Sequence, residues 1–545
     1  MREPLRLTVG GASYARTLER LVQDQVASRI AAKDSTLWGS DAQPDAAARL
    51  NWVSLHETSR PLLAEIDALR ADLWGEGIDR VVLCGMGGSS LATEVITATF
   101  GVDVLVLDST APSVVRRALA TDLQRTVVVI SSKSGGTVET DSQRRAFAQA
   151  FADAGIDPAS RLVVVTDPDS PLAGLAKESG YRRVFHADPD VGGRYSALTA
   201  FGLVPCGLAG VDVADLLDEA DEVAAALAAD STDNPALQLG AWMAASGGRD
   251  KVVLADSCSE LVGFPDWAEQ LIAESTGKSG TGLLPVVVED ATAPEVQDGA
   301  DDLLLGLFVN SEAAPDSTAP TAGTLPSTRP NTLPTARVAG PVGAQFLLWE
   351  TAIAVAGRLL GINPFDQPDV ESAKAAARGL LDQRPEATPP AFVSGSVEVR
   401  GSDGLLGDAD SVSGAVDALL TRLPEHGYLA LMAYLDPAHA DDLGAARAAL
   451  ARRCQRPVTF GWGPRFLHST GQYHKGGPPT GAFIQVTTDF SEDLPVPDRP
   501  FSFGSLIAAQ AAGDAQVLAD HGRPVLRLHL TETTAGLEQL RQALR

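Results

Sequence analysis

Residues 80–90 read RVVLCGMGGSS and residues 126–137 read TVVVISSKSGGT; each stretch joins a short apolar run to a loop of glycine and serine. Continuous β-branched runs between helical segments are typical of parallel strands that are covered on both faces. Similar runs recur at 102–108, 161–167 and 181–187. The pattern predicts a doubly wound α/β fold with its first sheet in residues 76–210.

The same alternation restarts twice further along the chain. Residues 251–257 (KVVLADS) open a second set of apolar runs, and residues 427–435 (GYLALMAYL) open a third. Residues 312–340, rich in Pro, Thr and Ala, predict a long loop or a linker, whose role stays open. We expect an N-terminal helical segment, two doubly wound parallel-sheet units and a C-terminal α/β region. Their predicted bounds are 1–75, 76–235, 236–385 and 386–545.

The composition narrows the classes of function. The chain has 545 residues, with 43 Lys and Arg against 70 Asp and Glu, a formal net charge of −27. This balance argues against nucleic acid and anionic membranes as partners, since both need a basic surface. No signal peptide or membrane span is expected, and the protein is predicted to be cytoplasmic. The four cysteines lack the spacing of a zinc site or a disulfide framework, and no metal is expected: Cys84, Cys206, Cys258 and Cys454.

Three loops follow predicted strands, where parallel sheets bind ligands. In residues 85–90 and 131–137, glycines, hydroxyls and a helix N-terminus suit a small anion, and Lys133 adds positive charge for a phosphate monoester. The alternative readings are a tight strand–helix turn and a Ser/Thr helix cap. In residues 192–196 (GGRYS), Arg194 either reaches over a ligand or is a surface charge beside a turn.

Gly277-Lys278-Ser279 imitates the end of a nucleotide-binding P-loop. The required first glycine would stand at position 272, which is Ile272, and the preceding residues predict a helix instead of a strand. The nucleotide interpretation is therefore rejected.

Four pieces in this order resemble the phosphoglucose isomerases: SSKSGGTVET at 131–140, GGRYS at 192–196, Gln270 with Glu274 in EQLIAESTGK, and FDQPDVESAK at 365–374. The order and spacing agree with that family across about residues 80–380. The resemblance implies two sugar-isomerase (SIS) type α/β domains in a homodimer, acting on small sugar phosphates without a cofactor.

The resemblance also implies roles for individual residues. Glu274 resembles the general base that moves a proton between C1 and C2 through a cis-enediol, Arg194 the cation that stabilises the enediolate, and Lys374 a partner in ring opening. A carbon acid does need a nearby carboxylate base and fixed positive charge. The non-catalytic alternative for Glu274 is a solvent-exposed carboxylate on a helix. The residues implied in holding the sugar phosphate are Gly88, Ser89, Ser132, Lys133, Ser134 and Thr137, with Gln270 and Gln367 lining the same pocket.

The chain departs from that family in its histidines. The family supplies a ring-opening histidine between the glutamate and FDQ segments, whereas residues 187–425 contain none. The segment RFLHSTGQYHKGG at 465–477 is the best-placed substitute, and it resembles the C-terminal segment of bacterial transaldolase–phosphoglucose isomerase fusions. His468 is the first candidate for ring opening, from the same chain or from a partner subunit. His474 is the second, and purely structural histidines remain the alternative.

These observations favour an aldose–ketose isomerase that interconverts glucose 6-phosphate and fructose 6-phosphate. Two alternatives stay open: an enzyme that also accepts mannose 6-phosphate, and a non-catalytic regulator that binds a phosphosugar. A regulator needs the loops at 85–90 and 131–137 but has no use for Glu274, Arg194 and Lys374 together.

Overall fold

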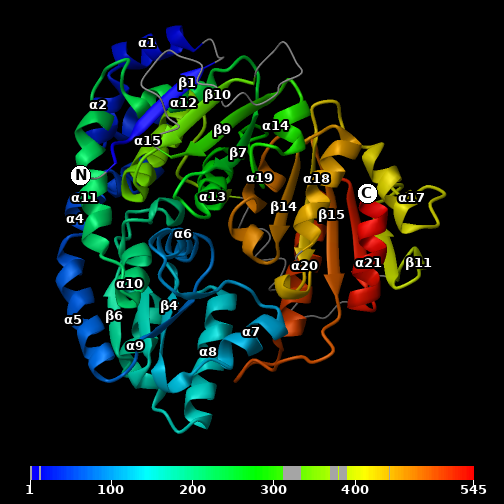
Figure 1. The fold of residues 1–545 in the computed structure, drawn as a ribbon, viewed down its shortest axis with the longest axis horizontal. Helices are drawn as coiled ribbons and strands as arrows, with labels where there is room; N and C mark the ends of the chain where they lie inside the picture. Colours follow the sequence, from blue (N-terminus) through cyan, green and yellow to red (C-terminus); the bar gives the residue numbers. More distant parts are fainter. Residues whose placement is uncertain (1–2, 11–13, 311–332, 369–378, 380–388, 441) are drawn as a thin grey trace.

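The computed structural model describes residues 3–10, 14–310, 333–368, 379, 389–440 and 442–545. Within this part the chain forms three sheets, as the sequence predicts, and Figure 1 shows them as three neighbouring units. The first lies at the lower left, the second at the upper left, and the C-terminal region at the right.

The first sheet is wholly parallel, with the order β3-β2-β4-β5-β6. Alternate strand residues enter two apolar cores, one on each face of the sheet. Helices α7, α8 and α9 cover one face, and α5, α6 and α10 cover the other. The strands are β2 (Arg80–Cys84), β3 (Leu105–Leu107), β4 (Thr126–Ser131), β5 (Leu162–Thr166) and β6 (Arg183–His186). The helices are α5 (Pro61–Gly75), α6 (Leu91–Phe100), α7 (Pro112–Leu119), α8 (Val138–Asp153), α9 (Pro171–Glu178) and α10 (Ala200–Ala209).

The second sheet has the order β1-β10-β9-β7-β8. Its strands are β1 (Arg6–Gly10), β7 (Lys251–Ser257), β8 (Leu284–Val288), β9 (Leu303–Val309) and β10 (Thr335–Ala339). Its helices are α11 (Val213–Leu227), α12 (Pro235–Ala244), α13 (Phe264–Thr276), α14 (Pro294–Asp298) and α15 (Val342–Leu360). Among the described helices α15 is the longest, and none has both the length and the apolar character that crossing a membrane requires.

Two strands in this sheet differ from the sequence-based expectation. Residues 335–339, expected to belong to a loop, form β10, while residues 311–332 lie outside the described part. The predicted N-terminal helical segment begins with β1, which pairs antiparallel with β10, Arg6 opposite Ala339. Both strands are short, and distant pairing holds them in place, so local composition does not reveal them.

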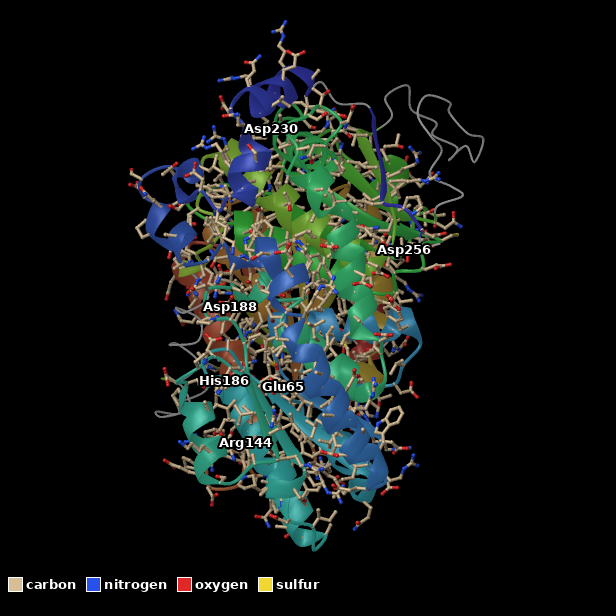
Figure 2. The ribbon with its side chains drawn as sticks, turned by 90° about the vertical axis from the view of Figure 1, so that its left-hand side faces the viewer. Glu65, Arg144, His186, Asp188, Asp230 and Asp256 are labelled. Atoms are coloured by element: carbon tan, nitrogen blue, oxygen red, sulfur yellow. The ribbon has the colours of Figure 1, made fainter. Side chains whose placement is uncertain are left out.

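The N-terminal helices pack against both the first and the second unit, on the face shown in Figure 2. Ser28 donates to Asp230 at 2.5 Å, Asn51 donates to Asp188 at 2.9 Å, and Arg183 on β6 pairs with Glu65 on α5 at 2.5 Å. The other helices here are α1 (Ala15–Gln23), α2 (Val26–Ala31), α3 (Gln43–Ala47) and α4 (Leu55–Thr58).

The C-terminal sheet has the order β11-β12-β16-β15-β13-β14, and β13 to β16 are parallel. The strands are β11 (Phe392–Ser394), β12 (Val397–Gly401), β13 (Tyr428–Tyr434), β14 (Val458–Trp462), β15 (Gly481–Thr488) and β16 (Val525–Leu530). The helices are α17 (Val412–Leu420), α18 (Asp442–Cys454), α19 (Gly471–Gly476), α20 (Phe503–Asp520) and α21 (Thr533–Leu544).

One core joins the C-terminal region to the second unit. Val253 and Ala255 of β7 belong to the same buried cluster as Ala430 and Met432 of β13, whereas their neighbours in sequence face other cores. An ion pair at 2.5 Å between Arg117 of α7 and Asp436 ties the region to the first unit. The C-terminal region is thereby positioned against both other units.

The three units share one strand order. In the orders β3-β2-β4-β5, β8-β7-β9-β10 and β14-β13-β15-β16, the second strand of a unit lies on one side of the first and the third lies on the other. A change of direction of this kind opens a crevice at the carboxyl ends of the two central strands. In the first unit those strands are β2 and β4, which end at the two predicted anion-binding loops.

Candidate active site

The loop after β2 lies against two distant parts of the chain. Gly87 has φ +55°, and a Cβ atom there would lie 2.8 Å from Gln270 Nε2 and 2.8 Å from the backbone oxygen of His468. Only glycine tolerates both that backbone conformation and that close approach. The loop, helix α13 and the turn η8 (Arg465–His468) therefore meet at one point.

Gly88 and Ser89 complete the same turn, η3 (Gly87–Ser89). A Cβ atom on Gly88 would lie 2.1 Å from the backbone oxygen of Gly193, and Ser196 Oγ donates to the backbone oxygen of Gly88 at 3.1 Å. The GGRYS segment is thereby placed directly against the loop after β2.

Gln270 and Glu274 lie one turn apart on α13 and face the same way. They are 3% and 5% exposed, and Gln270 Nε2 lies 3.4 Å from Glu274 Oε1. The same amide donates to the backbone oxygen of His468 at 2.8 Å. Glu274 is therefore a buried carboxylate at the meeting point of three segments, and the reading as a solvated helix carboxylate is wrong.

Arg194 is held rigidly beside this carboxylate. Its side chain is 1% exposed, and Nη1 lies 3.5 Å from Glu274 Oε2. Nη1 also donates to Gln367 Oε1 at 2.7 Å, Nε to Ser275 Oγ at 2.7 Å, and Nη2 to the backbone oxygen of Pro364 at 2.6 Å. The guanidinium thus supplies a fixed positive charge next to the carboxylate, and the reading of Arg194 as a surface charge is wrong.

The loop after β4 brings two hydroxyls together at the start of α8. Ser132 Oγ and Thr137 Oγ1 lie 3.0 Å apart, and α8 begins at Val138. Free backbone N–H groups and the positive end of the helix dipole meet at such a helix start. Two hydroxyls beside a helix N-terminus are suited to a phosphate group.

Lys133 and Ser134 make local contacts in the same loop. Lys133 Nζ donates to Asp167 Oδ2 at 2.8 Å and to the backbone oxygen of Pro189 at 3.1 Å. Burial lowers the pKa of Lys133, and Asp167 opposes that shift. Ser134 Oγ accepts from the Gly136 N–H at 3.3 Å and is exposed. The ammonium group is thus engaged by the loop after β5, and a bound phosphate would compete with Asp167 for it.

His468 reaches the first unit from the C-terminal region. Its Nε2 lies 3.1 Å from Oε1 of Glu139, a buried residue in the first turn of α8. Gln510 Nε2 of α20 donates to the same oxygen at 2.7 Å, and Thr110 Oγ1 donates to Gln510 Oε1 at 2.8 Å. The imidazole is therefore oriented by buried polar groups.

The second candidate, His474, lies elsewhere. Its Nδ1 lies 2.9 Å from the hydroxyl of Tyr428, and its ring packs against Phe466 and Phe483 in the C-terminal region. Burial, with the nearby charges of Lys475 and Arg523, lowers the pKa of His474 well below its usual value. A neutral histidine in an apolar core is suited to packing, so the structure does not bring His474 to the site.

Lys278, in a segment that only imitates a P-loop, lies beside Asp366 and Arg194 in this site. Nζ is 2.6 Å from both the backbone oxygen and Oδ1 of Asp366, whose backbone oxygen also accepts from Arg194 at 3.0 Å. Burial and the charge of Arg194 lower the pKa of Lys278 to about 8. The only sequence signal for Lys278 is its position one turn after Glu274. The sequence gives no signal for Glu139, because its partner His468 lies in the C-terminal region.

Two sequence-based expectations remain: the position of Lys374 and the absence of a metal site. Lys374 lies outside the described residues. Within the described part, one group of side chains has the ligand spacing for a metal ion, and it contains no predicted site residue: His56, Glu57 and Asp221.

A family model and the sequences of known proteins point to the same family. Residues 44–296 match the family described as phosphoglucose isomerase. A probable glucose-6-phosphate isomerase of Natronomonas pharaonis is 31% identical over 371 residues, which is 62% of this chain and 86% of that protein. A glucose-6-phosphate isomerase of Thermosynechococcus vestitus is 32% identical over 371 residues, covering 57% of this chain and 67% of that protein.

Solved structures agree with the fold. A hypothetical protein of Thermus thermophilus superposes with a TM-score of 0.57 and 26% identity, covering 69% of this chain and 100% of its own. A glucose-6-phosphate isomerase of Chlamydia trachomatis superposes with a TM-score of 0.55 and 20% identity, covering 68% of this chain and 86% of its own.

Proposed function

We propose, because the chain belongs to the phosphoglucose isomerase family, that it interconverts glucose 6-phosphate and fructose 6-phosphate through a cis-enediol. One observation carries the proposal: the buried carboxylate of Glu274 lies 3.5 Å from the guanidinium of Arg194. A carboxylate base beside a fixed cation is what proton transfer next to a carbonyl requires.

Glu274 takes the proton from one carbon of the substrate and returns it to the neighbouring carbon. Negative charge grows on the substrate oxygens as the enediolate forms. Arg194 is already held by Ser275, Gln367 and Pro364 and does not reorganise when that charge appears. Preorganised charge of this kind lowers the barrier more than a mobile surface arginine would.

The phosphate group of the substrate is assigned to the loop after β4. Ser132, Thr137 and the first N–H groups of α8 supply the donors, and Gly88 and Ser89 close the site from the neighbouring loop. Anchoring the phosphate there leaves the sugar carbons to reach toward α13.

Ring opening is assigned to His468 of the same chain. Histidine is suited to exchanging a proton with the ring oxygen because its ordinary pKa is near neutrality. The Glu139 carboxylate at 3.1 Å holds the imidazole in place. The role of Lys374 in this step rests on the resemblance alone.

The test is an enzyme-coupled assay of the purified chain with fructose 6-phosphate, run beside an assay with mannose 6-phosphate. Proton exchange with deuterated solvent at C1 and C2 reports the enediol directly. Turnover with exchange supports the proposal, and turnover of the mannose ester would extend it to that epimer. Binding of fructose 6-phosphate without turnover or exchange would instead identify a phosphosugar-binding regulator, an alternative that the isomerase names of the matched relatives do not favour.

Four further predictions belong to this proposal. The segment at 465–477 relates the chain to the isomerase part of transaldolase–phosphoglucose isomerase fusions. The protein forms a homodimer, acts in the cytoplasm, and is divided into domains near residues 75, 235 and 385. Size-exclusion chromatography with light scattering tests the dimer, and limited proteolysis tests the boundaries.

A further inference from the structure

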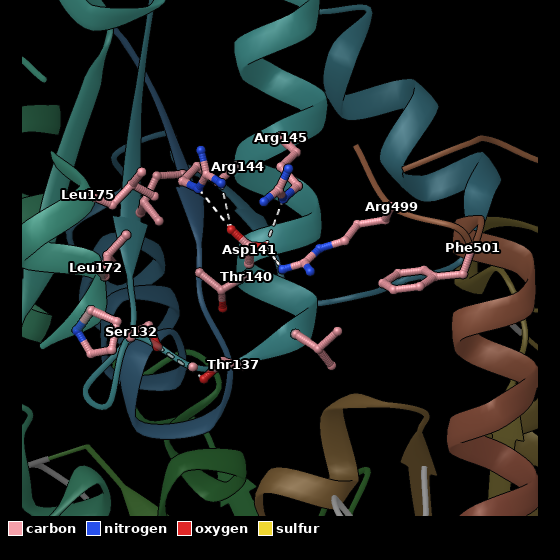
Figure 3. Close-up of a pocket in the computed structure, with 15 residues that line it drawn as sticks. Ser132, Thr137, Thr140, Asp141, Arg144, Arg145, Leu172, Leu175, Arg499 and Phe501 are labelled. Carbon is pink, nitrogen blue, oxygen red and sulfur yellow. Dashed lines mark hydrogen bonds and ion pairs between the residues drawn. The ribbon is translucent and has the colours of Figure 1, made fainter. Parts of the chain in front are cut away.

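The proposed active site has two regions with different tasks. The cavity shown in Figure 3, of about 450 Å³, has Ser132 and Thr137 in its wall and so belongs to the region assigned to the phosphate group. The other region surrounds Glu274, to which proton transfer is assigned. It holds Arg194 and a second buried cation, Lys278, which the proposed mechanism leaves without a role.

Arg194 takes three of its hydrogen bonds from one loop, residues 364–367. Its Nη2 donates to the backbone oxygen of Pro364 at 2.6 Å and to that of Asp366 at 3.0 Å. Its Nη1 donates to Gln367 Oε1 at 2.7 Å. A cation stabilises a developing charge best when its position is fixed beforehand. The position of this loop therefore determines how well the guanidinium can meet the enediolate.

Lys278 connects the loop to the end of α13. Its Nζ donates to the backbone oxygen and to Oδ1 of Asp366, both at 2.6 Å. The side chain of Lys278 is 3% exposed, and that of Asp366 is 35% exposed. Hydrogen bonds from a charged donor to a carboxylate are shorter and stronger than neutral ones. The backbone oxygen of Asp366 accepts from Arg194 as well, so one residue of the loop is held by two cations.

The other contacts of the loop lie before Asp366. Phe365 packs edge-on against Trp38, with ring centroids 4.8 Å apart, and so anchors the beginning of the loop in the apolar core. Among the described residues, the oxygens of Asp366 form hydrogen bonds with Lys278 and Arg194 alone. Lys278 is thus the group that fixes the part of the loop next to the guanidinium.

The charges around Lys278 are balanced at neutral pH. Burial and the charge of Arg194 lower the pKa of Lys278 to about 8, while Asp366 and Glu274 oppose that shift. Two cations then face two carboxylates. When Glu274 takes up the proton, its negative charge passes to the enediolate and the balance is kept. Above about pH 8 Lys278 loses its charge, and the carboxylates are left in excess.

We propose that Lys278 is a positioning residue for the isomerisation: through Asp366, its ammonium group holds residues 364–367 where they orient Arg194 toward the enediolate. This inference rests on the proposed function and adds to it a group that acts through Arg194. Without the ammonium group the loop is free to shift, and the enediolate loses stabilisation while the phosphate stays bound at the loop after β4. The effect therefore falls on kcat more than on KM.

The first test is steady-state kinetics of the full chain with fructose 6-phosphate. Lys278→Met removes the ammonium group and should lower kcat by about tenfold or more, with KM changed less than about threefold. Lys278→Arg restores the charge and should recover much of kcat. Lys177→Met, at an exposed lysine of α9, is the matched control and should behave as wild type.

Two outcomes of this assay have different meanings. An inactive wild-type chain would contradict the proposed function and with it this inference. An active wild type with unchanged kcat in folded Lys278→Met would overturn this inference alone.

A double variant tests whether Lys278 acts through Arg194. Residues that act as a unit have non-additive effects. In an Arg194→Gln background, Lys278→Met should therefore lower kcat by less than about twofold. The same tenfold loss in both backgrounds would show that the two residues act independently, and the proposal would be wrong.

The pH profile of kcat/KM tests the proposal where Lys278→Met does not fold. In wild type kcat/KM should fall above about pH 8, as Lys278 loses its proton. Asp366→Asn removes a charge that favours the ammonium form, so the fall should begin at a lower pH. Lys278→Arg carries a guanidinium that stays charged, so the fall should move to a higher pH. Identical alkaline limbs in the three proteins would overturn the proposal.

Discussion

Nε2 of His468 lies 3.1 Å from Oε1 of Glu139, although the two residues are 329 positions apart in the sequence. Gln510 of α20 donates to the same carboxylate oxygen, so the C-terminal region supplies both the histidine and a second group that fixes its partner. The first unit supplies the carboxylate from the opening turn of α8. The C-terminal region of the chain thus places a histidine against the first unit.

His468→Ala should slow turnover of the cyclic sugar phosphates by about 10²–10⁴-fold, the range usual for general acid–base groups. Proton exchange on an open-chain analogue should be largely retained, because ring opening is no longer needed. Glu139→Gln should impair the same step less, since it leaves the imidazole in place without its charged partner. Stopped-flow assays of both substrates measure the difference.

His521→Ala is the matched control for this experiment, because His521 is exposed. It should leave both rates unchanged. Equal loss on cyclic and open-chain substrates in His468→Ala would point to a folding role, and full activity on both would show that another group opens the ring.

Glu274→Gln keeps the size and polarity of the side chain but removes the proton acceptor. We expect kcat to fall by about 10²–10⁴-fold while KM changes little. Steady-state kinetics of this variant are compared with those of Glu260→Gln, an exposed glutamate that should behave as wild type. Near-normal turnover in Glu274→Gln would contradict the assignment of the base.

Ser132→Ala with Thr137→Ala removes the paired hydroxyls at the start of α8. Each lost hydrogen bond to a charged group weakens binding by about 1.5–3 kcal/mol, so KM for the sugar phosphate should rise by at least about tenfold. Ser40→Ala with Thr58→Ala, both exposed, serves as the control. An unchanged KM in the first pair would show that the loop does not hold the phosphate.

The raised pKa of Glu269, a residue of α13, predicts that the stability of the fold depends on pH. Burial, followed by the charge of Asp266, raises the pKa of Glu269 to about 8, whereas an unfolded glutamate titrates near about 4.3. Between these values the folded protein binds the extra proton, so this residue's contribution to the free energy of unfolding decreases as the pH rises toward about 8.

Glu269→Gln should flatten that dependence and become increasingly more stable than wild type between about pH 5 and about pH 8. Urea unfolding at several pH values measures the difference, with Glu260→Gln as the exposed control. Parallel stability curves for wild type and Glu269→Gln would show that the carboxyl is not protonated in the fold.

The predictable parts of the molecule were those encoded locally. The apolar runs ending in glycine loops identified β2 and β4, and the four-residue spacing of Gln270 and Glu274 placed both on one face of α13. Contacts between segments that are distant in the sequence could not be predicted from the sequence. Glu139 looks like an ordinary residue in the first turn of a helix until His468 is placed beside it.

Lys278 shows a different limit. The residues around it do not form a nucleotide-binding motif, because Ile272 stands at the position of the first glycine and helix α13 precedes the Gly-Lys pair. Its contact with Asp366 depends on how the chain after α15 returns to the end of α13. A motif search tests a residue for one function only, whereas the packing of the fold determines which groups the residue contacts.

The pairing of β1 with β10 has a consequence for how the protein is made. Gly10 leaves the ribosome long before Thr335, its partner in the sheet. At about 5–20 residues per second, β1 waits roughly 15–65 s for β10 to be synthesised. Throughout that interval a nascent strand with unpaired backbone groups is available to other chains. Residues 6–10 thus reach their native place only after more than half of the chain has been made, and chaperones that bind extended segments can act on them during that interval.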